Sequence, residues 1–491
     1  MKKIKDLIKN LSEVECKGNL DRTVSAIGFD SRKIEPSTQE TTSLYVAQKG
    51  TQMDGHLFIE QAIANGAGVV VCEELPAVFY DHITYLKVPD SAKALGMIAS
   101  AFYDYPSQKL KLTGVTGTNG KTTVVTLLYR LFHSLGYPVG LISTIENRIQ
   151  DEVIASTHTT PDAVALNHLL NEMVKAGCQY CFMEVSSHAV CQHRIEGLQF
   201  AGGIFTNITH DHLDFHETFA QYILAKKAFF DTLPKQAFAL VNKDDKNGLV
   251  MVQNSKANIK TYSLHGAADF KGKILDNRFE GLQMTLNGQE TFFRLSGKFN
   301  AYNLLAIYGA ALLLDIPQED ILVKMSDLQS ASGRFQLLRN QQGCIAIVDY
   351  AHTPDALKNV LTTIKDITQN SVALITVVGC GGNRDAAKRP KMAEIACQYS
   401  NKVILTSDNP RKEDPYQILQ EMEVGVPVEF RQNVLKIENR REAIKTATML
   451  LQKGDVLLIA GKGHENYQEI NGVRHHFDDW EVLRECFSSE L

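Results

Sequence analysis

One stretch of the chain has residue types that suit phosphate binding, Gly114-Val115-Thr116-Gly117-Thr118-Asn119-Gly120-Lys121-Thr122-Thr123. Glycines let the backbone turn tightly, so successive N–H groups can converge on phosphate oxygens. The lysine can reach the outer phosphates, and the hydroxyl of Thr122 suits Mg²⁺. A strand-like segment, 110–113, precedes the stretch, and a helix-like segment, 124–132, follows it. This order predicts an ATP-binding loop and an ATP-dependent enzyme; the alternative is a plain glycine turn between a strand and a helix.

The loop departs from the general pattern G-x-x-x-x-G-K-[ST] at one position. That pattern needs glycine at position 115, where this chain has Val115. We therefore interpret T-G-T-N-G-K-T-T as a shortened variant of the phosphate loop.

Two candidate metal ligands follow other strand-like segments. Glu184 ends the apolar segment 180–184, and His212 lies in 206–216, a polar segment rich in histidine and aspartate. Ligands bind at the carboxyl ends of strands in parallel α/β sheets. Either residue alone is more often solvated or hydrogen-bonded, but together with the phosphate loop they predict a magnesium site.

Four further basic residues need a separate interpretation. Lys226 and Lys227 lie in an amphipathic segment, 221–230, and spacing alone predicts that they are surface lysines. Arg384 and Arg411 lie in loops after strand-like segments of the last third of the chain. Because arginine captures carboxylates bidentately, these loops suit an acidic or amino-acid substrate; surface arginines in turns are the alternative.

Composition excludes several classes of protein. The chain has 491 residues, 44% of them hydrophobic and 22% charged, which predicts two to four globular domains. The formal net charge is −5 with no long basic run, so neither nucleic acid nor a membrane surface is an expected partner. The N-terminal residues 1–9 resemble an amphipathic helix and not a signal peptide, and no apolar run could span a bilayer.

The cysteines indicate a reducing compartment. There are nine, spread along the chain without a pairing framework, which predicts the cytoplasm. Cys178 and Cys181 form a single C-x-x-C in an apolar segment, and we interpret them as buried core thiols and not as zinc ligands.

Strand-like and helix-like segments alternate throughout, which predicts an α/β fold with parallel sheets and right-handed crossovers. We expect three domains, at residues 1–107, 108–331 and 332–491.

The motifs taken together resemble the Mur ligase family, most closely its MurE type, which adds meso-diaminopimelate. The resemblance covers nearly the whole chain and rests on the segments 30–32, 116–123, 183–188, 211–214, 225–226, 297–303, 332–334, 349–355, 379–385, 408–411 and 461–465. It implies a central ATP-binding ligase domain with a P-loop, flanked by an N-terminal α/β domain that binds UDP-MurNAc and a C-terminal Rossmann-like domain that binds the amino acid.

The resemblance also implies a reaction. ATP would phosphorylate the D-glutamate γ-carboxylate of UDP-N-acetylmuramoyl-L-Ala-D-Glu, and the amine of meso-diaminopimelate would attack the acyl phosphate. This is a step of cytoplasmic peptidoglycan precursor synthesis, and so of cell-wall biogenesis, cell shape and cell division. A monomer is implied. The ATP loop and the amino-acid arginines would have to meet, so the last domain should swing toward the middle one.

Residue roles carry over by motif. ATP would be held by Gly117, Thr118, Asn119, Gly120, Lys121, Thr122, Thr123, Asn303, Arg334 and Asp349. Mg²⁺ would be ligated by Thr122, Glu184, His212 and Lys226, the last as an N6-carboxylated lysine. The catalytic set would be Lys121, Glu184, His212 and Lys226. Three groups would bind the other substrates: Phe29, Ser31, Thr51, Gln52 and Met53 the uridine diphosphate sugar; Thr159, Thr160, Ser186, Gln192 and Arg194 the muramoyl dipeptide; Arg384, Asp408, Asn409, Pro410, Arg411, Gly461 and Glu465 the diamino acid.

Three alternatives stay open. The same ligase could add L-lysine, but lysine lacks the distal carboxylate for which Arg411 is suited. A folylpolyglutamate-synthetase-like ligase would have no use for the motif Asp30-Ser31-Arg32. A non-enzymatic nucleotide switch would not need Glu184, His212 and Lys226 together.

Overall fold

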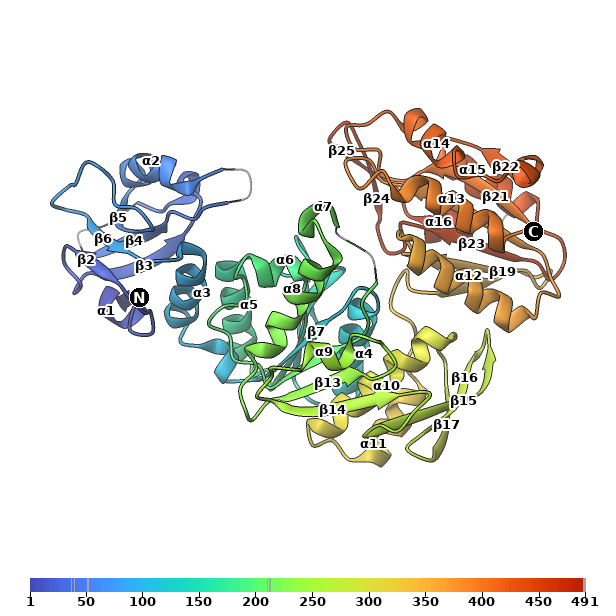
Figure 1. The fold of residues 1–491 in the computed structure, drawn as a ribbon, viewed down its shortest axis with the longest axis horizontal. Helices are drawn as coiled ribbons and strands as arrows, with labels where there is room; N and C mark the ends of the chain where they lie inside the picture. Colours follow the sequence, from blue (N-terminus) through green and yellow to red (C-terminus); the bar gives the residue numbers. More distant parts are fainter. Residues whose placement is uncertain (37, 39, 51–52, 210, 212, 489–491) are drawn as a thin grey trace.

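The computed structural model describes residues 1–36, 38, 40–50, 53–209, 211 and 213–488. Three α/β domains follow one another along the chain (Figure 1). The middle domain lies between the other two, and the N-terminus and C-terminus lie in the outer domains. The α/β prediction with parallel sheets is confirmed.

The first domain is built on a sheet with strand order β1-β3-β4-β5-β6-β2, in which β3 to β6 run parallel. The strands are β1 Lys2–Lys3, β2 Glu15–Lys17, β3 Thr23–Gly28, β4 Thr41–Val46, β5 Ala67–Cys72 and β6 Thr84–Lys87. The helices are α1 Ile4–Leu7, α2 Ile59–Ala64 and α3 Ser91–Phe102, with short 3₁₀ turns at Ser31–Lys33, Gly55–Phe58 and Pro106–Gln108. The helix expected over 1–9 is therefore shorter, because its first residues join the sheet as β1.

The middle domain has a large sheet of order β10-β9-β8-β11-β7-β12-β13-β14-β15-β16-β17. The neighbouring strands of the central run β8-β11-β7-β12-β13-β14-β15 pair in parallel. The pairings β8–β9 and β9–β10 at one edge and β15–β16 and β16–β17 at the other edge are antiparallel, which the sequence did not predict. The strands are β7 Lys111–Thr116, β8 Val139–Ile142, β9 Glu146–Ile149, β10 Glu152–Ala155, β11 Tyr180–Glu184, β12 Gly202–Phe205, β13 Phe238–Asn242, β14 Asn258–Ser263, β15 Phe270–Arg278, β16 Gly281–Leu286 and β17 Gln289–Phe293. The helices are α4 Lys121–Ser134, α5 Ala163–Lys175, α6 Ser187–Cys191, α7 Leu213–His216, α8 Phe219–Asp231, α9 Gly248–Met251, α10 Lys298–Leu313 and α11 Gln318–Ser326.

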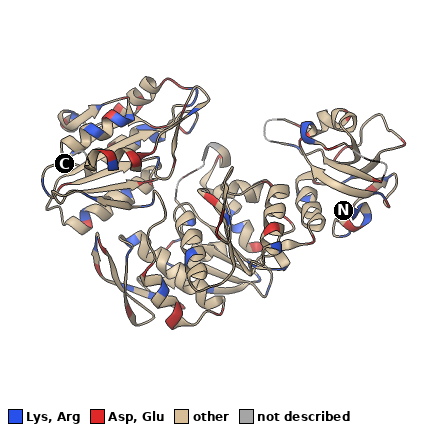
Figure 2. Cartoon of the chain, turned by 180° about the vertical axis from the view of Figure 1, so that it is seen from behind, with Lys and Arg blue, Asp and Glu red and all other residues tan. Residues whose placement is uncertain are grey.

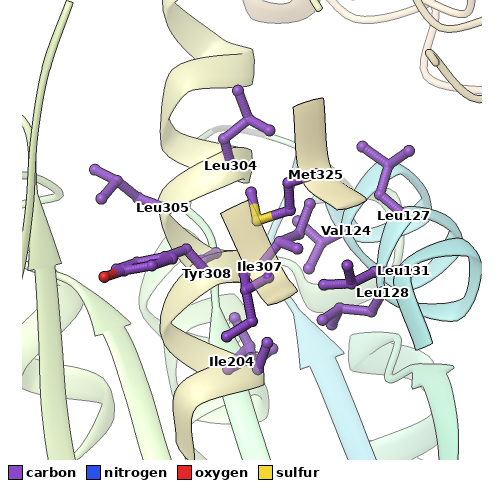
Figure 3. Packing of buried hydrophobic residues seen from close by; sticks show 14 of the residues in the cluster. Val124, Leu127, Leu128, Leu131, Ile204, Leu304, Leu305, Ile307, Tyr308 and Met325 are labelled. Carbon is purple, nitrogen blue, oxygen red and sulfur yellow. The ribbon is translucent and has the colours of Figure 1, made fainter. Parts of the chain in front are cut away.

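Helix α4, which begins at Lys121, packs in the core of the middle domain. Leu127 and Leu131 of α4 pack with Leu304 and Ile307 of α10 against one face of the sheet (Figure 3). Helix α10 is apolar on all sides, as a helix enclosed by other elements must be. Helices α5 and α8 contribute to the separate core on the opposite face, which also contains the buried thiols of Cys178 and Cys181. The burial of these two cysteines confirms their interpretation as core residues.

The last domain has a sheet of order β18-β19-β23-β20-β21-β22, parallel except for β18, and a separate hairpin of β24 and β25. The strands are β18 Gln336–Arg339, β19 Ile345–Asp349, β20 Leu374–Cys380, β21 Lys402–Ser407, β22 Val434–Lys436, β23 Val456–Ala460, β24 Tyr467–Ile470 and β25 Val473–His476. The helices are α12 Pro354–Thr368, α13 Lys388–Tyr399, α14 Pro415–Glu423, α15 Arg440–Met449 and α16 Asp479–Ser488, with a 3₁₀ turn at Val428–Asn433.

Charged side chains of both signs are interspersed in all three domains (Figure 2). Among the described residues, no helix combines the length and the apolar character needed to cross a membrane.

Candidate active site

One cavity lies where strand ends of two sheets face each other. Its volume is about 1610 Å³. It is lined by residues at the carboxyl ends of β7, β8, β11 and β12 in the middle domain and of β19, β20, β21 and β23 in the last domain. Strand carboxyl ends are the usual ligand sites of parallel sheets. The cavity is lined by these residues of the predicted sites: Thr118, Asn119, Gly120, Lys121, Thr122, Thr123, Thr159, Thr160, Glu184, Ser186, Arg194, Asn303, Arg334, Asp349, Arg384, Asp408, Asn409, Arg411, Gly461 and Glu465.

The remaining predicted residues lie elsewhere. Gly117, Lys226, Gln192 and Pro410 adjoin the lining without being part of it. Phe29, Ser31 and Met53 belong to the first domain, apart from the cavity. Thr51, Gln52 and His212 lie outside the described residues.

The phosphate loop is braced by the segment that follows β12. The backbone N–H of Thr118 donates to the carbonyl of Asn207 (2.8 Å), and the hydroxyl of Thr206 donates to the carbonyl of Asn119 (2.6 Å). Gly117 has φ +149°, and a Cβ there would lie 1.9 Å from Oγ1 of Thr206, so only glycine fits. Val115 is a fully buried residue of β7, which explains the shortened motif: the strand continues through the position where the general pattern turns.

Lys121 is the first residue of α4, and its side chain contacts the backbone of the phosphate loop. Its Nζ donates to the carbonyl oxygens of Gly117 and Thr118, both at 3.0 Å. Burial lowers the pKa of Lys121, while the carboxylates of Glu184 and Asp211 raise it. The amino end of a helix, a lysine and converging amides form a site for a polyanion.

Two side chains of the last domain reach the same loop. Nη2 of Arg334 donates to Oγ1 of Thr122 (3.2 Å), and Nδ2 of Asn119 donates to Oδ2 of Asp355 (3.2 Å). A third contact joins the two domains nearby, because Nζ of Lys388 donates to Oδ1 of Asp211 at 3.2 Å. The phosphate loop of the middle domain is therefore in direct contact with the last domain.

Asp349 and Asn303 also line the cavity. Asp349 ends β19 and accepts a hydrogen bond from the backbone N–H of Phe335 (2.7 Å). Burial raises the pKa of Asp349 to about 6, although Arg334 lowers it. Asn303 of α10 donates to Oδ1 of Asn300 (3.1 Å), and its own Oδ1 lies where a Cβ on Gly120 would come within 2.7 Å.

Glu184 is a fully buried carboxylate at the end of β11. Its Oε1 accepts from the backbone N–H of Thr144 (2.8 Å), whereas Oε2 is buried without a hydrogen bond to any described residue. A buried carboxylate oxygen in this state costs free energy unless a cation or donor meets it. The described residues contain no cluster of three or more His, Cys, Asp or Glu that could hold a metal.

Lys226 and Lys227 correct the prediction from spacing, because neither is on the surface. Lys226 is 1% exposed, and its Nζ donates to the carbonyl of Gly117 (2.8 Å). Lys227 is also buried and pairs with Asp231 (2.7 Å). Burial, followed by repulsion from Lys121, lowers the pKa of Lys226 well below the usual value for lysine.

A polar cluster connects β11 to the loop before α5. The hydroxyl of Thr160 donates to the carbonyl of Glu184 (2.8 Å), and Nη1 of Arg194 donates to the carbonyl of Thr160 (2.7 Å). Gln192 accepts from Nε and Nη2 of Arg194 and so holds the guanidinium from behind. Thr144 donates to Thr159 at 3.0 Å.

The opposite end of the cavity gathers residues of the last domain. Arg411 has φ +55°; its Nη1 donates to the carbonyl of Gly382 (2.7 Å), and its backbone N–H donates to that of Glu469 in β24 (2.9 Å). The hairpin therefore fixes the arginine. Nδ2 of Asn409 donates to Oε2 of Glu465 (2.7 Å). A guanidinium near two carboxylates, those of Asp408 and Glu465, suits a ligand that carries both carboxylate and ammonium groups.

The predicted residues of the first domain form a different surface. Ser31 is buried and donates to Oε1 of Gln61 (3.0 Å), while Phe29 and Met53 are exposed. Asp30 caps the turn Ser31–Lys33 and pairs with both Nε and Nη2 of Arg32 at 2.9 Å.

Some residues of the cavity had no role assigned from the sequence. Thr144, Asp355 and Lys388 line it. Thr144 and Asp355 contact the predicted residues Glu184 and Asn119, and Lys388 contacts Asp211. Lys462 contacts the predicted residue Asn409 from behind the lining. Asp355 and Lys462 lie within motifs used for the resemblance, so the signal was present without a role. Thr144 and Lys388 gave no signal, because only the fold brings them to the cavity.

Comparison with known proteins gives matches over the whole length. Three family patterns match: "Mur ligase family, catalytic domain" at residues 23–103, "Mur ligase middle domain" at 115–311, and "Mur ligase, glutamate ligase domain" at 333–463. A protein of Cytophaga hutchinsonii is 58% identical and one of Phocaeicola vulgatus 54% identical. The matches cover 99% of this chain and 99% and 100% of theirs. Both are named UDP-N-acetylmuramoyl-L-alanyl-D-glutamate–2,6-diaminopimelate ligase. A solved structure with the same name is 34% identical, has a TM-score of 0.71 and covers 99% of each chain.

Proposed function

This chain belongs to the Mur ligase family, and we propose that it is an ATP-dependent amide ligase that joins meso-diaminopimelate to the D-glutamate γ-carboxylate of UDP-N-acetylmuramoyl-L-Ala-D-Glu. The observation that carries the proposal is the full-length identity of 58% to a relative named for that ligation. The cavity supports it, because a phosphate loop and an arginine–carboxylate cluster line a single space. The step belongs to cytoplasmic peptidoglycan precursor synthesis, hence to cell-wall biogenesis, cell shape and cell division.

The chemistry follows from the weakness of a carboxylate as an acyl donor. An oxygen of the γ-carboxylate attacks the γ-phosphorus of ATP and ADP leaves, which gives an acyl phosphate. The free amine of the diamino acid then attacks the carbonyl carbon, and phosphate leaves as the amide forms and the amine loses a proton. Charge on the transferring phosphoryl group is offset by positioned cations. The ATP phosphates would be bound by Lys121, Arg334 and the amides of the phosphate loop. The rest of the nucleotide would be surrounded by residues Thr118 to Thr123, Asn303 and Asp349.

Mg²⁺ fits the residues at the end of β11. The buried Oε2 of Glu184, without a hydrogen bond, is an oxygen ligand of the type that Mg²⁺ prefers. Thr122 and Glu184, with His212 and a carboxylated Lys226, would hold the ion, which when bound neutralises charge on phosphate oxygens.

Carboxylation of Lys226 is supported by its burial. A carbamate forms when a neutral amine nitrogen attacks carbon dioxide and releases one proton. Burial is the main cause of the lowered pKa of Lys226, and a lower pKa increases the fraction of neutral amine. The neighbouring Lys121 would then face the negative charge of the carbamate.

The other substrates would occupy separate parts of the structure. Thr159, Thr160, Ser186 and Arg194, with Gln192 behind the arginine, would hold the muramoyl dipeptide. Arg384, Asp408, Asn409, Pro410, Arg411, Gly461 and Glu465 would hold the diamino acid. The uridine diphosphate end would reach the first domain at Phe29, Ser31 and the segment 51–53. We place the domain boundaries near 107 and 331 and propose a monomer.

Addition of L-lysine is the second candidate, and Arg411 separates the two. The arginine is fixed by the carbonyl of Gly382 and by the backbone of Glu469, so it is ready to pair with a distal carboxylate, which lysine lacks. A guanidinium left without that partner costs binding free energy.

The test is ATP-dependent phosphate release with the UDP-muramoyl dipeptide, comparing meso-diaminopimelate with L-lysine in wild type and in Arg411→Ala. We expect strong preference for diaminopimelate, and a loss of about 100-fold in kcat/KM for it in the variant, the scale of one charge-assisted pair. Preference for lysine would refute the specificity, and no turnover with either would refute the ligase and return folate-type substrates to consideration.

A further inference from the structure

Lys462 is a fully buried lysine that the ligation does not use directly. It lies in the turn after β23, between Gly461 and Gly463, which have φ +117° and +54°. Its side chain is 0% exposed and does not line the cavity. A buried ammonium is costly unless its N–H groups are paired, so its partners identify what the lysine does.

Among the described residues, the hydrogen-bond and ion-pair partners of its Nζ all belong to the amino-acid end of the cavity. Nζ lies 3.2 Å from Oδ1 of Asn409, 3.2 Å from Oε2 of Glu465 and 3.5 Å from Oδ1 of Asp408. Asn409 in turn donates to the same Oε2 of Glu465 (2.7 Å). The three side chains of Lys462, Asn409 and Glu465 therefore form a closed ring of hydrogen bonds.

This ring fixes two orientations that a ligand would meet. Oδ1 of Asn409 accepts from Lys462 and from the backbone N–H of Glu469 (2.9 Å), so the amide cannot flip. Oε2 of Glu465 is used twice, by Lys462 and Asn409, and among the described residues Oε1 has no hydrogen-bond donor. Oε1 is thus the oxygen free to accept from an ammonium group.

The ring also sets the charge of the site. Asp408 and Glu465 are neighbouring carboxylates, and Lys462 is the cation in contact with both. Burial raises the pKa of Glu465, and Asp408 raises it further, whereas Lys462 and Asn409 lower it. Tyr350, Tyr467 and the buried Arg440 also interact electrostatically with Glu465. Lys462 therefore opposes protonation of the carboxylate.

We propose that Lys462 is a positioning residue for the amino-acid substrate: it holds Glu465 and Asn409 in their binding orientation and keeps Glu465 ionised to receive a substrate ammonium. The proposal rests on the ligase activity proposed above. It predicts weaker binding of the diamino acid when the ammonium group of Lys462 is removed. Glu465 would then be protonated more often, and a protonated glutamic acid cannot form an ion pair with the substrate ammonium.

The experiment measures kcat and KM for meso-diaminopimelate, for ATP and for the UDP-muramoyl dipeptide between pH 6 and pH 8.5, each with the other two substrates saturating. The variants are Lys462→Met, which keeps the side-chain length, Lys462→Arg, which keeps the charge, and Lys445→Met as the matched control. Lys445 is an exposed lysine of α15 in the same domain.

In Lys462→Met we expect KM for the diamino acid at pH 7 to rise by about tenfold, because Glu465 loses the cation that lowers its pKa and is more often protonated. The defect should diminish as the pH rises to 8.5, because Glu465 ionises again. KM for ATP should stay at the wild-type value, the acid limb of the profile should return toward wild type in Lys462→Arg, and Lys445→Met should match wild type throughout.

Two results would overturn the proposal while wild type is active. One is an unchanged KM and pH profile in Lys462→Met. The other is a parallel loss for all three substrates without a shift of the pH profile, which would show a purely structural lysine. Wild type that releases no phosphate with meso-diaminopimelate would refute the proposed ligase instead.

Discussion

A buried ion pair ties the C-terminal helix to the strand end beside the amino-acid cluster, and breaking it should be costly. Arg440, the first residue of α15, pairs with Asp479, the first residue of α16, through Nε–Oδ1 and Nη2–Oδ2 contacts of 2.7 Å each. Both side chains are 0% exposed. Nη2 also donates to the carbonyl of Ala460 (3.0 Å), the last residue of β23 before Gly461.

The change Asp479→Ala leaves the guanidinium buried without its counter-ion. Removing one partner of such a pair destabilises by about 3–5 kcal/mol. Nη1 of Arg440 already has no hydrogen bond to a described residue, so few alternatives remain. With a urea dependence of about 2 kcal/mol/M for a domain of this size, the unfolding midpoint should fall by about 2 M.

The assay is urea unfolding followed by tryptophan fluorescence. The chain has a single tryptophan, Trp480, next to Asp479 in α16, so the signal reports on this helix in the full chain. The pair Arg441 and Glu485 joins the same two helices at the surface, and Glu485→Ala is the matched control, with an expected cost under about 1 kcal/mol. The double change Arg440→Met with Asp479→Leu replaces both charges by apolar groups and should recover most of the loss.

The reasoning would be refuted if Asp479→Ala moved the midpoint by less than about 0.5 M, the effect expected of a surface pair. It would also be refuted if the double variant were as unstable as the single one, because the cost would then come from lost packing and not from an unpaired buried charge.

Two further outcomes are expected. With ¹³C-labelled bicarbonate, wild type should give a carbamate signal that is absent in Lys226→Met and retained in Lys227→Met, because Lys226 has the lowered pKa and Lys227 is paired with Asp231; a signal that survives in Lys226→Met would exclude carboxylation there. The pKa of Asp349 is raised to about 6 in the folded protein, from a value near 3.8 in the unfolded chain, so folding favours its protonated form. The contribution of Asp349 to the free energy of unfolding is therefore fully present below pH 3.8 and is lost as the pH rises through 6. Asp349→Asn cannot ionise and should gain about 2 kcal/mol relative to wild type between pH 4 and pH 7 in denaturation measurements, and an equal pH dependence in both proteins would contradict this.

The local parts of the fold could be predicted from the sequence because their signals are local. The phosphate loop, the apolar strands that precede the polar loops, and the alternation of strands and helices follow from residue types within a few positions of one another. The strand ends were correct guides to the cavity, since parallel strands present their carboxyl ends at one edge. The site residues inferred by resemblance remain predictions, although most of them line one cavity.

Other features depended on which elements cover each other. Lys226 and Lys227 resembled surface lysines because their spacing defines a face of α8 but not what packs on it. Contacts such as Asn119 with Asp355 and Lys388 with Asp211 join residues 236 and 177 positions apart. The role of Lys462 likewise depends on three side chains from two strand ends. Sequence determined which chemistry each loop could support, and tertiary structure decided which loops meet, because burial and charge pairing are properties of neighbours in space and not in the chain.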